Sequence, residues 1–260
     1  MDKLCIVIPA YNEEKRIGRT LEVYSTFFDK LKNKDFNYNL LIVINNTKDR
    51  TEEIVRSFSK KNKHIKFVNL IKGGKGYAIT EGFKLALKED YSLIGFVDAD
   101  IATSPEQFYR LVKGISRYDV SIANRYDKNS KIVPAYSFRR LIVSRIFNFI
   151  VRVLFSLPYH DTQCGAKLLR KEALEKVIPD LTLMGWAYDV NLLYACHLKG
   201  LKVVEVPTVW AEKEYSKLRV GKVSIQMFLA VLQLWVDKSI FRRLVIPLKP
   251  LIRNLWGKVK

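Results

Sequence analysis

The chain has 260 residues, 48% of them hydrophobic, which is enough for a buried core and argues against a disordered protein. Its 45 Lys and Arg residues outnumber its 26 Asp and Glu residues, and the formal net charge of +19 suits an anionic membrane surface, a phosphorylated substrate or nucleic acid. The three cysteines are widely spaced and lack a paired Cys/His pattern, which argues against a disulfide framework and a zinc site.

Short β-branched runs alternate with amphipathic segments over the first half of the chain. This alternation predicts an α/β fold with a largely parallel sheet, covered by helices and with its ligands at the carboxyl ends of the strands. Polar clusters at 9–14, 45–51 and 98–104 fall at those ends. The predicted strands are Leu4–Ile8, Leu40–Ile44, Ile65–Val68, Leu93–Val97 and Val120–Ala123, and the predicted helices are Glu13–Leu31, Arg50–Lys60, Gly76–Glu89 and Pro105–Arg117.

Two amphipathic helices are predicted in the second half, at 137–157 and 224–240. The first places Arg145, Asn148 and Arg152 on one face, and a basic tail follows the second. Neither reaches the roughly 20 uncharged residues that cross a bilayer. We expect both to lie in a membrane interface, with closure of the core or a homo-oligomer contact as the alternative.

Two acids, Asp98 and Asp100, stand where a buried strand meets a loop. Carboxylates this close repel each other unless a divalent cation neutralises both, and Mg²⁺ or Mn²⁺ prefers such oxygen ligands together with substrate phosphates. The alternative is a solvated turn at the end of a strand. The pair therefore predicts a metal site that takes a phosphorylated ligand.

A glycine-rich stretch at 71–78, with Lys75 at its centre, opens a predicted helix. Backbone N–H groups and a lysine at a helix N-terminus can hold an anion. The spacing fits neither a Walker loop nor a dinucleotide fingerprint. The stretch predicts an anion-binding loop, with a flexible surface turn as the alternative.

Together these motifs resemble the family 2 glycosyltransferases, in the family's order and over nearly the whole chain. Residues 6–14 are similar to the family's nucleotide-binding opening, 45–51 to its second strand-end loop, 73–76 to its glycine-lysine loop and 98–100 to its metal-binding Asp-x-Asp. Within the family the likeness is to polyprenyl-phosphate monosaccharide synthases, especially dolichyl-phosphate β-glucosyltransferases. It is carried by residues 98–103, 161–168 and 186–194.

The resemblance implies a Rossmann-like GT-A fold over residues 1–222, with a nucleotide-sugar half (1–125), an acceptor half (126–222) and an interfacial helix at 137–157. A basic amphipathic helical tail would follow at 223–260. The implied activity is inverting transfer of a monosaccharide, glucose being favoured, from a nucleotide-diphosphate sugar, a UDP-sugar being favoured, to polyprenyl or dolichyl phosphate. No secretory signal pattern opens the chain, so we expect a peripheral protein without a transmembrane helix on the cytoplasmic face of a membrane.

The resemblance also assigns roles to residues. Asp98 and Asp100 would hold Mg²⁺ or Mn²⁺, and Arg125 with Arg139 would contact the acceptor phosphate, Arg140 being the alternative to Arg139. That phosphate is mostly a dianion at neutral pH, so Asp189, at the position of a catalytic base, would only orient the sugar or a side chain. The implied catalytic residues are Asp100, Asp189, Arg125 and Arg139, and the implied nucleotide-sugar residues are Pro9, Tyr11, Glu13, Asn45, Lys75, Asp98, Ala99, Asp100, Gln163, Trp186, Ser216 and Lys217.

Three positions depart from the family pattern. Asn45 stands where an acid is usual, Tyr215 where glycine is usual, and Ala102 where mannose synthases often place a metal-ligating Gln, which disfavours mannose. The alternatives are a family member that uses GDP-mannose or a non-lipid acceptor, and a basic nucleic-acid-binding module. The last leaves both acids unexplained and lacks a recognition motif, so we expect no nucleic-acid partner. The sequence leaves the oligomeric state open.

Overall fold

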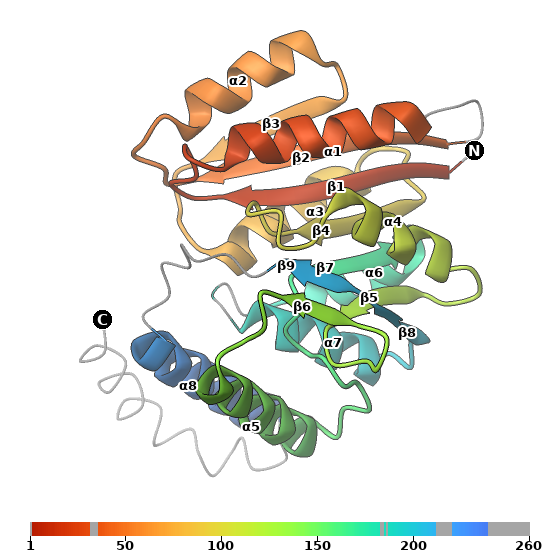
Figure 1. Ribbon diagram of the computed structural model, residues 1–260. Coiled ribbons are helices and arrows are strands. Elements are labelled where there is room, and N and C mark those ends of the chain that lie inside the picture. Colours follow the sequence, from red (N-terminus) through yellow and green to blue (C-terminus); the bar gives the residue numbers. More distant parts are fainter. Residues whose placement is uncertain (1, 32–35, 183–184, 186, 212–219, 239–260) are drawn as a thin grey trace.

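A seven-stranded β-sheet runs through the centre of the protein (Figure 1). The computed structural model describes residues 2–31, 36–182, 185, 187–211 and 220–238. The strands follow the order β3-β2-β1-β4-β7-β5-β8, all parallel except β7, which is antiparallel to both of its neighbours. Their bounds are β1 Asp2–Ala10, β2 Phe36–Asn45, β3 Ile65–Leu70, β4 Leu93–Val97, β5 Val120–Asn124, β7 Ala166–Arg170 and β8 Val203–Pro207.

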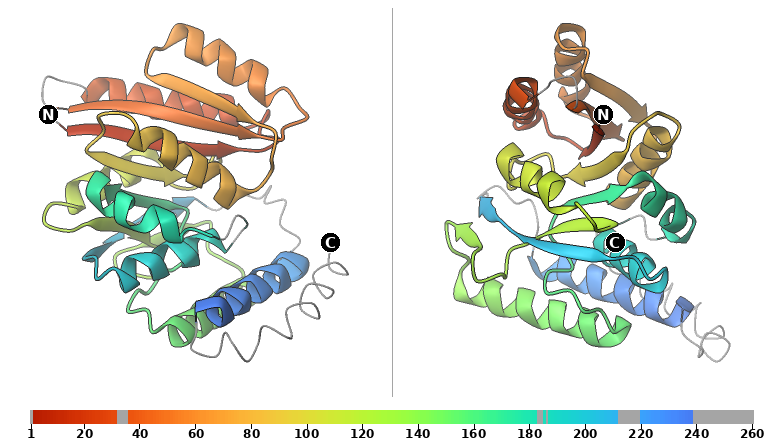
Figure 2. Two further views of the ribbon diagram at one scale, coloured as in Figure 1. Left: turned by 180° about the vertical axis from the view of Figure 1, so that it is seen from behind. Right: turned by 90° about the vertical axis from the view of Figure 1, so that its right-hand side faces the viewer.

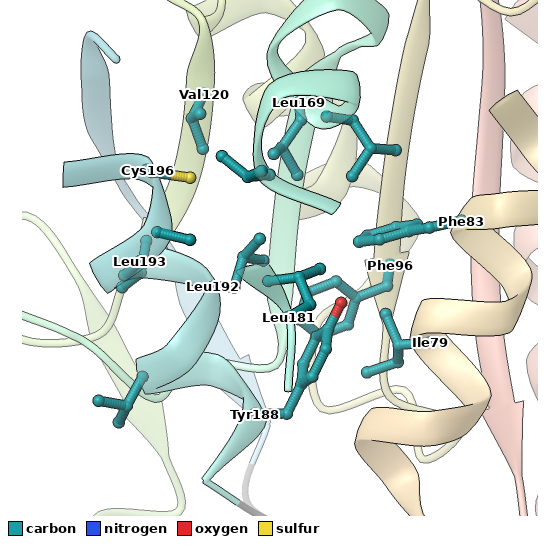
Figure 3. Close-up of a cluster of buried hydrophobic side chains, with 14 of the residues drawn as sticks. Ile79, Phe83, Phe96, Val120, Leu169, Leu181, Tyr188, Leu192, Leu193 and Cys196 are labelled. Atoms are coloured by element: carbon teal, nitrogen blue, oxygen red, sulfur yellow. The ribbon is translucent and has the colours of Figure 1, made fainter. Parts of the chain in front are cut away.

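Helices cover both faces of this sheet (Figure 2). On one face α1 (Ile17–Leu31), α2 (Thr51–Lys61) and α4 (Pro105–Gly114) bury one apolar core. On the other face α3 (Lys75–Leu87), α6 (Lys171–Val177) and α7 (Tyr188–Leu198) bury a second, and the 3₁₀ turn η1 (Ile178–Asp180) follows α6. In the second core the Phe96 ring packs edge-on against both Phe83 and Tyr188, the first residue of α7 (Figure 3). The α/β class and all five predicted strands are confirmed.

The first helix begins later than predicted. It starts at Ile17 rather than Glu13, and a turn at 14–16 precedes it, in which the Glu13 carbonyl accepts from the backbone N–H groups of Arg16 and Ile17. Pro105 occupies the first turn of α4 as predicted. The Ser104 hydroxyl, however, bonds the Glu106 carboxylate instead of capping the helix.

Two long helices lie side by side beyond the β8 edge of the sheet (Figures 1 and 2). They are α5 (Phe138–Phe155) and α8 (Val220–Lys238), and a small parallel sheet of β6 (Lys131–Val133) and β9 (Val209–Ala211) leads toward them. Among the described residues no helix is long and apolar enough to cross a membrane. The predicted boundary between 222 and 223 falls inside α8, and the domain division stays a prediction.

Candidate active site

Two polar turns at the carboxyl edge of the sheet are tied to each other. The backbone N–H of Asn12 donates to Thr47 Oγ1 (3.1 Å), and that of Glu13 donates to Thr51 Oγ1 (2.7 Å). Asp49 accepts from the Thr51 backbone N–H (3.0 Å). Burial would raise the pKa of Asp49, but the hydrogen bonds it accepts outweigh burial and hold the pKa below its ordinary value. The predicted nucleotide-binding turn is therefore braced before any ligand arrives.

The buried side chain of Asn45 joins the end of β1 to the glycine loop. In the amide orientation that satisfies both groups, its nitrogen donates to the Ala10 carbonyl and its oxygen accepts from the Gly74 N–H, each at 3.0 Å. A carboxylate cannot donate to a carbonyl. The departure from the family's usual acid thus gives Asn45 a bracing role at the site, and its predicted nucleotide contact stays a prediction.

Asp98 and Asp100 lie just beyond the end of β4. A Cβ at Gly165 would lie 2.0 Å from Asp98 Oδ2, so only glycine leaves room for this carboxylate. Asp100 Oδ1 accepts from the Ala102 N–H (2.9 Å), across Ile101 in a left-handed conformation (φ 59°). A β-branched residue there costs roughly 1–3 kcal/mol. The loop is thus held in a strained form that places both acids at the edge.

Lysines and acids alternate beside this loop. Lys75 Nζ lies 2.6 Å from Asp98 Oδ1 and 3.8 Å from Asp189 Oδ2. On the other side of Asp189, the fully buried Lys167 donates from Nζ to Asp189 Oδ1 and to the Cys164 carbonyl (2.6 Å). Asp189 is therefore held between two ammonium groups.

The electrostatics of the loop fit a divalent cation. Burial most of all, and then the nearby Asp100, raises the pKa of Asp98, while Lys75 opposes the shift. Burial would lower the pKa of Lys75, but attraction to Asp98 and Asp189 leaves it above its ordinary value. No group of three or more His, Cys, Asp or Glu able to hold a metal occurs among the described residues. Two carboxylates would leave positions for phosphate oxygens and water, as Mg²⁺ prefers.

Arg125 is held in a buried ion pair. Its Nε donates to Asp161 Oδ2 (2.7 Å), Nη2 to Asp161 Oδ1 (2.9 Å) and Nη1 to the Tyr136 hydroxyl (3.1 Å). The guanidinium also lies 5.0 Å from the ring centroid of Trp210. Burial would raise the pKa of Asp161, but Arg125 outweighs it and lowers the pKa. A guanidinium carries five N–H groups, so two remain beyond these three bonds.

A basic rim surrounds this ion pair. The Arg140 guanidinium lies 4.7 Å from the ring centroid of Tyr136, and that of Arg145 lies 4.1 Å from the ring centroid of Tyr126. Both arginines project from α5. Helix α5 therefore brings positive charge near Arg125, while the predicted role of Arg139 stays a prediction.

The remaining predicted residues differ in their setting. The Tyr11 ring is 50% exposed at the edge, whereas Glu13 is paired with Arg16 through both carboxylate oxygens (2.6 Å each). Gln163 Nε2 is buried and has no hydrogen-bond partner in the structure, and its predicted contact with the nucleotide sugar stays a prediction. Pro9 lies in β1, and the Ala99 carbonyl accepts from Thr20 (2.6 Å). The Arg139 side chain, Trp186, Ser216 and Lys217 lie outside the described residues.

Sequence reasoning missed the roles of Lys167, Asp161 and Trp210. Lys167 and Asp161 stood inside a quoted motif without an assigned role. A lysine within an apolar strand such as Ala166–Arg170 is a usable signal, because a buried ammonium needs a buried acid. Trp210 carried no signal, because its contact with Arg125 depends on the long connection between β5 and β9.

Comparison with known proteins places the chain in a family. The model described as "Glycosyl transferase family 2" matches residues 5–178. The dolichyl-phosphate beta-glucosyltransferase of Dictyostelium discoideum is 32% identical over 91% of this chain and 77% of that protein, and the Saccharomyces cerevisiae protein of the same name is 30% identical over 86% and 71%.

Solved structures share the fold. Glucosyl-3-phosphoglycerate synthase from Mycobacterium tuberculosis, crystallised with Mn²⁺, UDP and phosphoglyceric acid, aligns with a TM-score of 0.66 and 17% identity over 90% of this chain and 78% of that one. The same enzyme with Mg²⁺ and UDP aligns with a TM-score of 0.64 and 16% identity over 92% and 81%. The predicted GT-A fold is confirmed. The chain belongs to glycosyl transferase family 2 and is a glycosyltransferase.

Proposed function

We propose that this enzyme transfers glucose from UDP-glucose to dolichyl or another polyprenyl phosphate, with inversion at the sugar. The observation that carries the acceptor and the sugar is the 32% identity, over 91% of the chain, to a dolichyl-phosphate beta-glucosyltransferase. UDP is the nucleotide in the structural neighbours. GDP-mannose and a non-lipid acceptor remain the alternatives that an assay must exclude.

The donor side follows from the carboxyl edge. Asp98 and Asp100 would hold Mg²⁺ or Mn²⁺, which would neutralise the diphosphate and stabilise it as a leaving group. Lys75, 2.6 Å from Asp98, lies where its ammonium reaches the same phosphates. Tyr11 offers an exposed ring for the base, and the Gln163 amide, whose buried nitrogen has no partner, would donate to the sugar or phosphate once a side-chain movement exposes it.

The acceptor needs no general base. A phosphate monoester has a second pKa near 6, so an acceptor oxygen is already charged and forms the new bond to the sugar C1 as the bond from C1 to the UDP oxygen breaks. Asp189 supports this reading because it is paired with Lys167 and faces Lys75. We assign it the role of positioning Lys75.

Arg125 would contact the acceptor phosphate with the two N–H groups that its bonds to Asp161 and Tyr136 leave over. Asp161 cancels much of its charge, so Arg125 would orient the phosphate, and Arg145 on the rim would add positive charge. Arg139 stays a candidate for the same clamp.

Helix α5 would hold the enzyme at the membrane. Its buried side packs Val151 and Phe155 into the core, whereas its outer side exposes an apolar stripe at helical spacing. Such a stripe beside arginines suits the interface of an anionic leaflet. We propose peripheral attachment to the cytoplasmic face, with a contact between two copies of the chain as the competing use of this stripe, which comprises Phe138, Ile142, Ile146, Phe149 and Val153.

One assay tests the proposal. Purified protein is given a panel of nucleotide sugars with a short polyprenyl phosphate, and the lipid product is identified by mass. We expect product from UDP-glucose, its loss in a chelator and its return with Mg²⁺ or Mn²⁺. Product from GDP-mannose alone, or transfer only to a non-lipid acceptor, would replace the proposal with one of its alternatives.

A further inference from the structure

Lys75 holds one oxygen of Asp98, the carboxylate that the proposed function makes a metal ligand. Of the two carboxylate oxygens, Oδ2 is packed against Gly165, where even a methyl group would lie 2.0 Å away. Oδ1 is the oxygen that Lys75 holds at 2.6 Å. A divalent cation bound to the same oxygen would lie close to the Lys75 ammonium group, and the two positive charges would repel each other.

Among the residues that the structure describes, a released Lys75 has one other acid within 4 Å. Asp189 is its second acid, at 3.8 Å, but the other oxygen of that carboxylate is taken by Lys167. Both ammonium groups also lie over the Phe96 ring, with Lys75 Nζ 6.0 Å and Lys167 Nζ 5.5 Å from its centroid. Lys75 itself is only 17% exposed, so water compensates a lost partner poorly.

A diphosphate supplies what the protein lacks. It offers anionic oxygens to the displaced ammonium and, at the same time, ligands to the metal. The three acids Asp98, Asp100 and Asp189 exceed the two lysines by one negative charge, so the site on its own attracts a divalent ion only weakly.

We propose that Lys75 is an internal counter-ion, which holds the Asp98 carboxylate until a divalent metal and the donor diphosphate bind together. This rests on the proposed function, because it takes Asp98 and Asp100 as the metal ligands. Each ligand then raises the affinity of the other by the same factor. The free enzyme binds metal weakly, and the loaded enzyme releases metal more readily once the diphosphate has left.

The test is a binding measurement that needs no acceptor and no turnover. Mn²⁺ affinity is measured by electron paramagnetic resonance, with and without UDP, on the wild type, Lys75→Met and Lys84→Met. Lys84 is the matched control, because it lies on the same helix in an exposed ion pair with Glu81 (2.8 Å). Lys75→Gln, which keeps a hydrogen-bond donor without the charge, replaces Lys75→Met if the latter does not fold.

We expect UDP to raise the Mn²⁺ affinity of the wild type and of Lys84→Met by about 5- to 150-fold, the usual range for coupled sites. Lys75→Met is expected to bind Mn²⁺ about tenfold more tightly than the wild type without UDP. It should keep the part of the enhancement that comes from phosphate oxygens binding the metal, so its enhancement by UDP should be smaller than that of the wild type. Mn²⁺ affinity that is unchanged or weaker in folded Lys75→Met would overturn the counter-ion and leave the metal site standing. Absence of Mn²⁺ binding by the wild type, with or without UDP, would overturn the metal role and the counter-ion together.

Discussion

Asp98 and Asp161 are both acids beside a cation, and their settings are opposite. Asp161 is almost fully buried and meets Arg125 through both oxygens, with a further bond from the Arg125 backbone N–H (2.9 Å). Asp98 is 29% exposed and meets one ammonium through one oxygen. The first acid is satisfied by the protein, whereas the second has one ammonium contact that a metal ion could replace. Whether a paired acid can bind a ligand thus depends on how many of its carboxylate oxygens the protein already bonds.

Asp100→Asn should have the largest effect. It removes the charge of a proposed metal ligand and leaves the oxygen that accepts from Ala102, so the fold should survive. We expect transfer to fall by at least about a hundredfold. Steady-state kinetics and circular dichroism check both parts, with the exposed Asp90→Asn as control. Full turnover by Asp100→Asn, or in a chelator, would contradict the metal role.

Arg125→Ala tests the buried ion pair between Arg125 and Asp161. It leaves the Asp161 carboxylate buried without its partner, so we expect the free energy of unfolding to fall by about 3 kcal/mol, as measured by urea denaturation. We expect kcat/KM for transfer to fall as well, by about 2–4 kcal/mol, with UDP affinity nearly unchanged.

Arg125→Lys separates the structural role of Arg125, its pairing with Asp161, from its proposed contact with the acceptor phosphate. Lysine keeps a charge for Asp161 but lacks the planar fork, so stability should recover more than transfer does. The exposed Arg117→Ala serves as the control. Parallel recovery of stability and transfer would mean that Arg125 only braces the fold.

Asn45→Asp tests whether the Asn45 side chain holds the glycine loop in place for the donor. The carboxylate cannot donate to the Ala10 carbonyl, so we expect a loss of about 1–3 kcal/mol in the free energy of unfolding. UDP affinity should fall, because the glycine loop loses its anchor at Gly74. Calorimetry on folded protein measures both, and tighter UDP binding would instead support the family's usual acid as a direct contact.

Ile146→Glu is expected to have the smallest effect. The side chain is exposed, so the melting temperature should hold, while partitioning to vesicles with anionic lipid should fall about tenfold. Leu198→Glu, an exposed leucine on α7, is the matched control and should partition as the wild type does. Unchanged partitioning with a loss of dimers in sedimentation would assign the stripe to a second copy of the chain.

Local pattern predicted most of the donor half. Strands and helices alternate there, so Asp98 and Asp100 were expected at the carboxyl edge of the sheet, and the structure places Lys75 beside Asp98. The acceptor half was less accessible, because β7 enters the sheet antiparallel between β4 and β5. No periodicity announces that insertion, and it pairs Arg125 with Asp161.

The segment from 161 to 167 sets the spacing between the two halves of the reaction. Asp161 at its start holds Arg125, Gly165 packs on Asp98, and Lys167 at its end holds Asp189. Its length therefore sets the distance between Asp98 on the donor side and Arg125 on the acceptor side. A residue inserted between 161 and 165 would lengthen this segment without replacing any of the side chains of the site. Such a chain should still bind each substrate alone and fail to bring them within reach of each other.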